Sequence, residues 1–411
     1  MIKPEILAPA GNMTCLQAAI NAGADAIYLG LDTLNMRCGA TVSFTKENLP
    51  EASARCRSAG VKLYLTVNTI IFEGELGQLD EMLSFAKPYI DAAIVSDWAA
   101  VAACKRHGVP VHISTQMSCS NSASAAFLKS QGAERVVLAR ECTIEEVAEI
   151  ASKVDIELET FVHGAICVAV SGRCFMSQHA YGFSANRGEC RQPCRRKYTV
   201  VEEKSGEGPL ASFDVQGHNV FSARDLFALP LLDKLTEAGI RSFKIEGRGR
   251  NAEYVATVTA AYREARDAVL AGEFNEELVA RLRTQCETVY HRELAEGLYH
   301  GRPGKDQFCS DGAENLATLK KEHIGIITNY FVKAGVAELL VHNDALRNGD
   351  VLSIQGNATG VLDIVVENIQ CDGEPADEVP RGHLATFKCE TRVRKNDIAY
   401  RMTEAVPQKN G

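Results

Sequence analysis

The 411-residue chain has room for one large domain and a smaller one. Its 46% hydrophobic and 24% charged residues are the balance of an ordinary globular protein. The net charge of −9 excludes wholesale, non-specific binding of nucleic acid but allows a local basic surface. No apolar run reaches the roughly 18 residues of a membrane span, and the first residues lack a signal-peptide layout. We therefore expect a cytoplasmic protein without a membrane partner.

The first 250 residues repeat one sequence pattern, in which a predicted helix is followed by a glycine and a short β-branched run. The glycine suits the left-handed end of a helix, and the apolar run suits a strand buried on both faces. Eight strands are predicted in this part of the chain. They lie at 5–8, within 23–29 and 60–67, at 92–95, within 108–113 and 132–138, at 157–162 and within 239–245.

Eight strand-then-helix units predict an α/β fold, a TIM-type (β/α)8 barrel over residues 1–300. A doubly wound open sheet is the alternative. No G-x-G-x-x-G motif follows the first strand, which argues against a dinucleotide-binding version of that sheet.

The seventh connection of the predicted barrel, residues 163–240, is far longer than the usual handful of residues. We expect it to hold a hairpin around residues 205–209 and a helix from about Ser222. Long insertions at the C-terminal face of barrel strands are where such folds keep their chemistry.

Four cysteines in this insertion, Cys167, Cys174, Cys190 and Cys194, have the spacing C-x6-C-x15-C-x3-C. Structural zinc favours a C-x2–4-C knuckle at each end of its site, and only the last pair fits one. Iron–sulfur clusters accept looser spacing. Disulfides are unusual in a cytoplasmic protein. A catalytic or redox cysteine, such as Cys167 paired with His163, and thiols without a ligand role remain open.

Polar and charged side chains near the predicted strand ends are candidates for a substrate pocket at the barrel mouth. The alternative for any one of these side chains is that it only makes a hydrogen bond that stabilises the fold. Arg37, Arg140 and Arg248 could each clamp a carboxylate in a bidentate fork. The substrate-binding candidates are Arg37, Asn68, Gln116, Arg140, His163, Arg173, Lys244, Glu246 and Arg248.

Basic residues interleave with the last two cysteines and form a candidate RNA-binding face. The alternative is an ordinary solvated surface. The candidates are Arg187, Arg191, Arg195, Arg196 and Lys197.

After a predicted linker at 301–321, residues 322–411 contain only short strands. Tight turns at 348–350 and 395–397 separate some of them. This pattern predicts a small C-terminal antiparallel β-barrel or sandwich. The strands are expected at 323–328, 336–341, 350–354, 361–366, 383–387 and 397–401.

Several motifs closely resemble the signature of the collagenase-like peptidase family U32. The most specific are the stretches at 161–167, 171–174 and 190–195, which carry the four cysteines. The resemblance covers essentially the whole chain. Further matching stretches are 7–11, 23–28, 114–116 and 244–248.

Despite the family name, the resemblance implies an iron–sulfur hydroxylation enzyme that works without oxygen. The family's branches act on tRNA, on ribosomal RNA or on ubiquinone precursors. The cysteine spacing and appended β-domain are most similar to the bacterial branch that makes 5-hydroxyuridine at the tRNA wobble position, with prephenate as hydroxyl source. The ubiquinone branch lacks the β-domain, and the ribosomal branch is longer.

By this resemblance, Cys167, Cys174, Cys190 and Cys194 would bind a 4Fe–4S cluster over the barrel mouth, with zinc as the alternative. The expected partners are tRNA and a small carboxylated co-substrate. The target uridine would leave its stack to reach the pocket, which is easiest in a single-stranded loop. A peptidase remains the first rival. A non-catalytic RNA-binding or assembly factor with structural zinc is the second.

Overall fold

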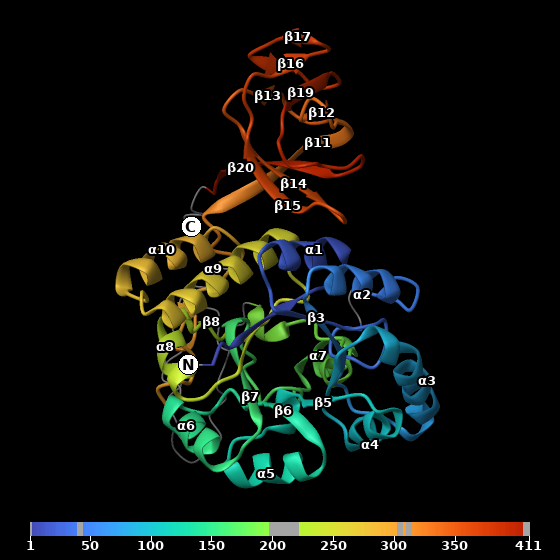
Figure 1. The fold of residues 1–411 in the computed structure, drawn as a ribbon, viewed down its shortest axis with the longest axis vertical. Coiled ribbons are helices and arrows are strands. Elements are labelled where there is room, and N and C mark those ends of the chain that lie inside the picture. Colours follow the sequence, from blue (N-terminus) through green and yellow to red (C-terminus); the bar gives the residue numbers. More distant parts are fainter. Residues whose placement is uncertain (1, 39–43, 197–221, 302–306, 310–314, 406–411) are drawn as a thin grey trace, which may run out of the picture.

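The computed structural model describes residues 2–38, 44–196, 222–301, 307–309 and 315–405. A barrel ringed by helices forms the larger part of the molecule, and a β-domain stands beside helices α1 (Met13–Asn21) and α9 (Ala252–Ala271) of that ring (Figure 1). No helix in these ranges is both long and apolar enough to cross a membrane.

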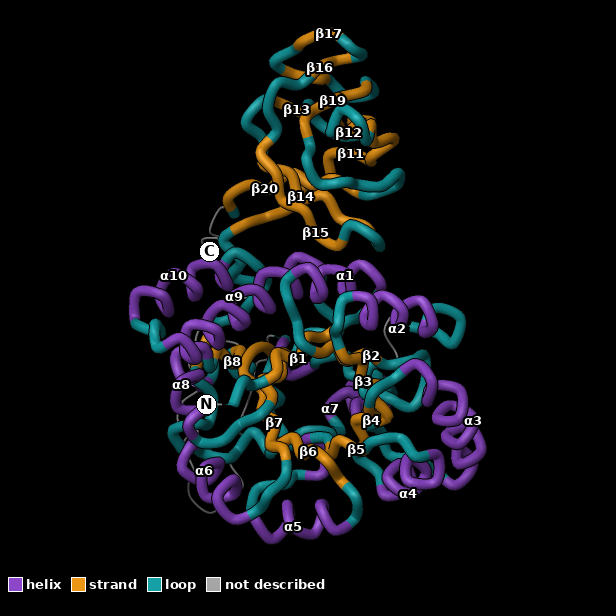
Figure 2. Tube along the Cα trace, viewed as in Figure 1, coloured by secondary structure: helices purple, strands orange, loops and turns teal. Residues whose placement is uncertain are grey.

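The barrel is closed by eight parallel strands (Figure 2). Seven of them pair in chain order from β1 to β7, and β9 pairs with both β1 and β7. This closure confirms the (β/α)8 prediction and excludes the open sheet. The strands are β1 (Glu5–Pro9), β2 (Ala26–Leu29), β3 (Lys62–Val67), β4 (Ala92–Val95), β5 (Val111–Ile113), β6 (Ala133–Val137), β7 (Glu157–Gly164) and β9 (Ser242–Ile245).

Helices follow the strands and bury their apolar faces against the outside of the barrel. Local signals set where they start. Asn12 caps α1 and Asp97 caps α4, while Thr143 and Glu146 form a capping box at α6. The helices are α1 (Met13–Asn21), α2 (Leu49–Ser58), α3 (Leu76–Ala86), α4 (Trp98–His107), α5 (Ser122–Ser130), α6 (Ile144–Lys153), α8 (Leu232–Glu237), α9 (Ala252–Ala271) and α10 (Glu276–Glu287).

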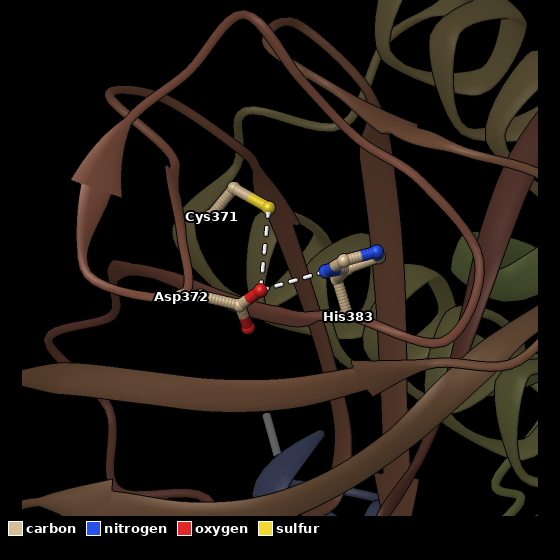
Figure 3. A group of neighbouring side chains, drawn as sticks. All are labelled: Cys371, Asp372 and His383. Atoms are coloured by element: carbon tan, nitrogen blue, oxygen red, sulfur yellow. Dashed lines mark hydrogen bonds and ion pairs between the residues drawn. The ribbon is translucent and has the colours of Figure 1, made fainter.

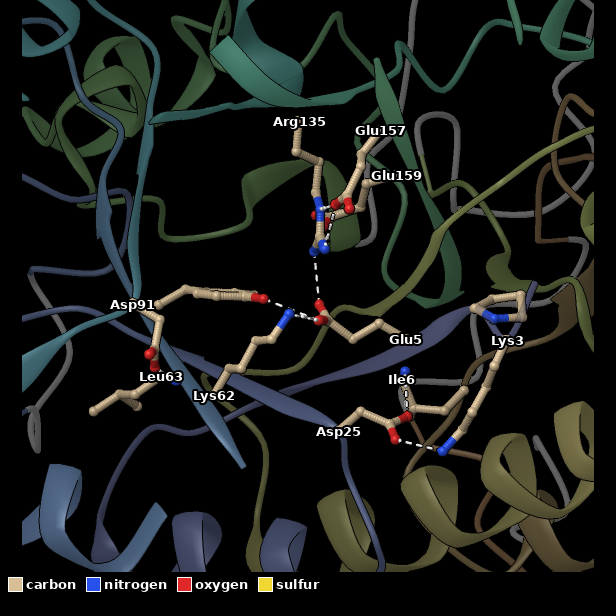
Figure 4. Close-up of polar contacts among 12 residues, drawn as sticks. Lys3, Glu5, Ile6, Asp25, Lys62, Leu63, Asp91, Arg135, Glu157 and Glu159 are labelled. Atoms are coloured by element: carbon tan, nitrogen blue, oxygen red, sulfur yellow. Dashed lines mark hydrogen bonds and ion pairs between the residues drawn. The ribbon is translucent and has the colours of Figure 1, made fainter. Parts of the chain in front are cut away.

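The barrel interior is unusually polar, whereas such interiors are mostly filled by branched aliphatic side chains. Arg135 lies 2.6 Å from Glu5 and 3.2 Å from Glu159 (Figure 4). Tyr64 donates to Glu5 at 2.9 Å. Lys244 lies 2.9 Å from the second carboxylate oxygen of Glu159. A column of paired charges therefore runs from the start of β1 toward the carboxyl ends of the strands.

The long insertion after β7 contains a short helix, α7 (Met176–Tyr181), and, among its described residues, one further strand. β8 (Asp225–Phe227) pairs antiparallel with the end of β7, and β10 (Leu294–Ala295) pairs parallel with β8. The prediction of a helix from about Ser222 is wrong, because Asp225 is held in a strand by a buried ion pair with Arg292. The predicted hairpin at 205–209 lies outside the described residues.

The C-terminal part forms an eight-stranded antiparallel sheet, which confirms the predicted fold class of this part. β11 begins inside the predicted linker. A separate two-stranded sheet pairs β13 with β18. The strands are β11 (Leu319–Phe331), β12 (Val336–Val341), β13 (Leu346–Arg347), β14 (Val351–Gly356), β15 (Gly360–Val365), β16 (Gln370–Cys371), β17 (Glu374–Pro375), β18 (Glu378–Val379), β19 (Leu384–Lys388) and β20 (Ile398–Glu404).

Polar contacts join the β-domain to the outer face of α1 and α9 (Figure 1). Asn21 donates to the carbonyl of Thr359 at 2.9 Å, and Lys321 lies 2.8 Å from Glu253. These contacts lie on the outside of the helix ring, so the β-domain leaves the barrel mouth uncovered by its own strands.

Candidate active site at the barrel mouth

A cavity of about 170 Å³ opens at the carboxyl ends of the barrel strands. Strand ends form one wall and the cysteine-bearing insertion forms the other. Its lining includes Tyr28, Met36, Arg37, Thr66, Asn68, Ser114, Gln116, Arg140, Phe161, Cys167, Cys174, Asn186, Cys190, Gln192, Cys194, Arg195, Lys244, Glu246 and Arg248.

All four predicted cysteines line this one cavity as free thiols. Cys167 and Cys190 are exposed, and Cys174 and Cys194 are half-buried. Burial raises the pKa of the Cys194 thiol, Arg195 opposes that rise, and the other three thiols add to it. The sulfur atoms are therefore near enough to influence one another, although they come from positions up to 27 residues apart.

The insertion is held over the barrel by specific contacts at the backbone. The guanidinium of Arg195 donates to the carbonyls of Ile166 and Ala223, which lie at opposite ends of the insertion. The side chain of Asn186 accepts from the backbone of Cys174 at 2.9 Å. Because these donors and acceptors satisfy each other, the cysteine loops are positioned by the protein itself.

Gly188 allows the insertion to approach the loop after β2. Its φ is +92°, and a Cβ at this position would lie 2.3 Å from the carbonyl oxygen of Asn35 and 2.7 Å from the Sγ of Cys38. The Cys38 thiol donates to the carbonyl of Arg187 at 3.0 Å. Only glycine fits both the backbone conformation and the space.

The four sulfur atoms are spread more widely than the ligands of one zinc ion. A tetrahedral site with Zn–S bonds of about 2.3 Å would place its sulfur atoms about 3.8 Å apart. In the described part of the chain, no three of these thiols lie within 4.8 Å of one another. The donor set is entirely sulfur, which suits both structural zinc and iron–sulfur clusters, so the separation of the thiols is what distinguishes them.

Cationic side chains dominate the other wall of the cavity. Arg37 lies 3.3 Å from Glu246. Burial opposes ionisation of Glu246, but Arg37, Arg248 and Arg140 outweigh it and hold the pKa of that carboxyl below its usual range. Three guanidinium groups thus surround one ionised carboxylate, which gives this wall an affinity for anions.

Two of these guanidinium groups keep a buried nitrogen without a hydrogen-bond partner among the described residues, the Nε atoms of Arg140 and Arg248. Arg140 donates to the carbonyl of Ala165 and lies over the ring of Phe161 at 4.2 Å. Arg248 donates to Thr66 at 2.6 Å and to Asn35 at 3.0 Å. Each group is thus oriented by the protein while part of its donor capacity is unused.

The structure brings together most of the residues that the sequence singled out. Seven substrate-binding candidates line the cavity, namely Arg37, Asn68, Gln116, Arg140, Lys244, Glu246 and Arg248. His163 and Arg173 are not among the lining residues. His163 is instead buried against Phe227, Tyr254 and Tyr262, and burial lowers its pKa to about 3.

The basic residues of the insertion have three different environments. Arg195 is committed to backbone carbonyls, and Arg187 pairs with Glu75. Arg191 and Arg196 lie over the rings of Phe183 and Tyr181. Lys197 lies outside the described residues.

Sequence reasoning missed the lining residues Thr66, Phe161 and Asn186. The first two lie within strands and point inward, in step with Tyr64 and Glu159, so strand alternation could have identified them. Asn186 belongs to the insertion, and no sequence signal marks it.

A second group of potential metal ligands lies in the β-domain, at Cys371, Asp372 and His383 (Figure 3). The carboxylate of Asp372 lies 2.6 Å from the Nδ1 of His383 and accepts from the backbone of Leu384 at 3.1 Å. These bonds join the turn after β16 to the start of β19. Their structural role accounts for the arrangement, and we assign it no ligand.

Residues 11–308 match the family model described as Peptidase family U32. The chain belongs to this family. It is 38% identical to a protein of Porphyromonas gingivalis named "Collagenase", over 97% of both chains. It is 35% identical to "tRNA hydroxylation protein P1" of Bacillus subtilis, over 96% of this chain and 94% of that one. A 23S rRNA 5-hydroxycytidine synthase of Escherichia coli is 30% identical over 84% of this chain and 52% of its own length.

Proposed function

We propose that this member of family U32 hydroxylates an RNA base, and that its target is the wobble uridine of tRNA, which becomes 5-hydroxyuridine. The observation that carries the proposal is the cavity itself, where four thiols and a cationic wall face the same space. A relative named for tRNA hydroxylation aligns over nearly the full length of both chains, β-domain included.

In this proposal, Cys167, Cys174, Cys190 and Cys194 hold a 4Fe–4S cluster. Their wide separation suits a cluster better than a single zinc ion. When bound, the cluster would supply a Lewis-acidic and redox-active centre for oxygen-independent hydroxyl transfer. The protein's own contribution is to hold that centre beside the cationic wall.

The cationic wall would bind the co-substrate, for which we propose prephenate. Arg140 and Arg248 offer unused, pre-oriented donors, and a guanidinium recognises a carboxylate in a bidentate geometry. Arg37 is paired with Glu246, so a bound carboxylate would compete for it. Lys244 is held in place by its ion pair with Glu159 and adds a positive charge from the barrel interior. These groups orient the co-substrate and replace the water that would otherwise surround its charges.

Two measurements test the proposal. An anaerobic preparation should contain about four iron and four sulfide per chain, and stoichiometric zinc in their place would contradict the cluster. Nucleoside mass spectrometry of tRNA from a deletion strain should show loss of wobble hydroxyuridine derivatives. If these remain at wild-type levels in a strain without a paralogue, the tRNA assignment is wrong.

A collagenase-like peptidase is the second candidate, because the chain is 38% identical to a protein named "Collagenase". A cysteine peptidase needs a base beside its nucleophile. His163, four residues before Cys167, is enclosed by aromatic rings and is not among the cavity-lining residues. Gelatin cleavage that persists in purified protein and is lost in Cys167→Ala, with no iron bound, would favour this candidate over the hydroxylase.

A further inference from the structure

The rim of the cavity carries large apolar side chains that soluble surfaces usually avoid. Phe72 is 56% exposed in the loop after β3, and Phe175 is 69% exposed just before α7. Tyr181 and Phe183, at the end of α7 and beyond it, are 37% and 38% exposed. Phe175, Tyr181 and Phe183 lie between the lining residues Cys174 and Cys190, and Phe72 lies four residues after the lining residue Asn68.

Three of these rings are each covered by an arginine. The guanidinium carbon lies 4.8 Å from the ring centroid for Arg187 over Phe72. The corresponding distances are 4.3 Å for Arg191 over Phe183 and 4.9 Å for Arg196 over Tyr181. We call these three pairs the stacking rim.

Among the described residues, the charges of the stacking rim are only partly neutralised. Arg187 pairs with Glu75, but Arg191 and Arg196 make no ion pair with a carboxylate within the described ranges. Flat, partly exposed rings combined with unneutralised guanidinium groups match a ligand that is both aromatic and anionic. Unpaired RNA bases have this chemistry, because they stack on aromatic and guanidinium planes while their phosphates attract cations.

We propose that the stacking rim binds the unpaired bases that flank the target nucleotide. This inference rests on the proposed action on RNA and names the surface that receives it. The net charge of −9 repels a polyanion as a whole, so a local surface must supply the attraction. Stacking on the rim would hold the neighbours of the target base while that base enters the cavity.

The test is fluorescence anisotropy on the full-length protein, with a labelled RNA stem that carries a seven-base loop. Phe72→Ala and Phe183→Ala should each weaken binding roughly tenfold, in the range of one lost base stack. Phe183→Trp keeps a stacking surface and should bind as wild type does. Phe127→Ala removes an equally exposed ring from α5 on the outer helix ring and should leave binding unchanged.

Salt dependence separates stacking from charge. Arg191→Gln should reduce the slope of log affinity against log salt by about one, whereas the phenylalanine variants should keep the wild-type slope. Wild-type affinity in Phe72→Ala and Phe183→Ala would overturn the proposal. An equal loss on a fully paired duplex would also overturn it, because a duplex offers no free bases to stack.

The outcome is separable from that of the proposed function. If the rim variants bind the loop RNA more weakly but tRNA from the deletion strain keeps its hydroxyuridine, the stacking-rim proposal is supported and the hydroxylase proposal fails. If hydroxyuridine disappears from the strain but the rim variants bind normally, the rim proposal fails. Wild-type protein that binds gelatin and no loop RNA would contradict the rim as an RNA surface.

Discussion

The lower interior of the barrel and its mouth use the same kinds of charged residue in opposite ways. Below, Arg135 is enclosed by Glu5, Glu157 and Glu159, so each buried charge has a partner (Figure 4). At the mouth, Arg140 and Arg248 keep buried donors without partners in the described structure. Breaking a closed buried ion pair destabilises the fold, whereas unused and oriented donors can bind a ligand.

Lys244 connects the two regions. Its ammonium group pairs with Glu159 at the top of the closed network, and its side chain also lines the cavity. It lies 4.5 Å from the ring centroid of Tyr28, which also borders the cavity. The network thus holds one charge of the cationic wall in place. Substitutions in the lower interior should mainly affect stability, and substitutions at the mouth should mainly affect binding.

The largest effect should come from opening the lower network. Arg135→Met should lower the free energy of unfolding by about 3–5 kcal/mol, because it leaves buried carboxylates unpaired. Urea denaturation followed by circular dichroism measures this. The control, Glu157→Gln, alters a partner that is 54% exposed and should cost less than about 1 kcal/mol. Equal costs for both variants would show that the network is not closed in solution.

The same network should make the free energy of unfolding depend on pH in the acidic range. Burial opposes the charge of Glu159, but Lys244 and Arg135 lower its pKa to about 2. The group therefore stabilises the fold above its unfolded pKa of about 4.3, and this stability is lost as the pH falls toward 2. Urea midpoints at several pH values should show a steeper decline in wild type than in Glu159→Gln. Parallel declines would contradict the assignment.

At the mouth, the expected effect is on binding. Arg140→Gln removes an oriented guanidinium and should weaken binding of prephenate, the proposed co-substrate, by roughly tenfold or more, the value of one charge-assisted hydrogen bond. Isothermal titration calorimetry measures it. Arg106→Gln, on the outer face of α4, is the control and should bind normally. Unchanged affinity in Arg140→Gln would remove this residue from the co-substrate site.

A smaller effect is expected on iron content when the glycine that lets the insertion approach the loop after β2 is replaced. A second glycine with a positive φ but no close neighbour serves as the control for backbone strain. Gly188→Ala and Gly182→Ala both place a side chain at positive φ, which costs about 1–2 kcal/mol. Only Gly188 lies against the loop that contains Cys38, while nothing lies within 4 Å of a Cβ at Gly182. Iron per chain should therefore fall in Gly188→Ala alone. Equal iron contents would show that this close approach does not support the thiols.

The smallest effect on stability is expected from the ion pair that joins the barrel to the β-domain. Glu253→Gln removes the ion pair with Lys321 at the junction of α9 and β11. This partly exposed pair should contribute less than about 1 kcal/mol to the free energy of unfolding. Thermal melting should change little, and cavity properties should be untouched. A separate early transition in the variant would show that this pair holds the β-domain in place.

Local patterns in the sequence determined the barrel and which cysteines line its cavity. The recurrent glycine before each β-branched run marked where helices end and strands begin, as at Gly132 before β6. Strand 92–95 matches β4 residue for residue. These signals work because helix ends and buried strands are specified by neighbouring residues. The spacing of the four cysteines likewise indicated one shared site, and all four line one cavity.

Tertiary structure decided what no local pattern contains. His163 is four residues from Cys167, but a register shift in β7 between Phe161 and His163 accompanies its packing against Tyr254 and Tyr262 of α9. Arg195 reads as a surface charge in the sequence, yet it closes the insertion through backbone carbonyls.

The ion network and the stacking rim join residues that lie far apart in the chain. Glu5 meets Arg135, and Phe72 meets Arg187, across more than 100 residues in each case. Such contacts depend on strand register and barrel closure, which are long-range properties. The sequence therefore determined which groups the protein has for its chemistry, and only the closed barrel decided which of them face one another.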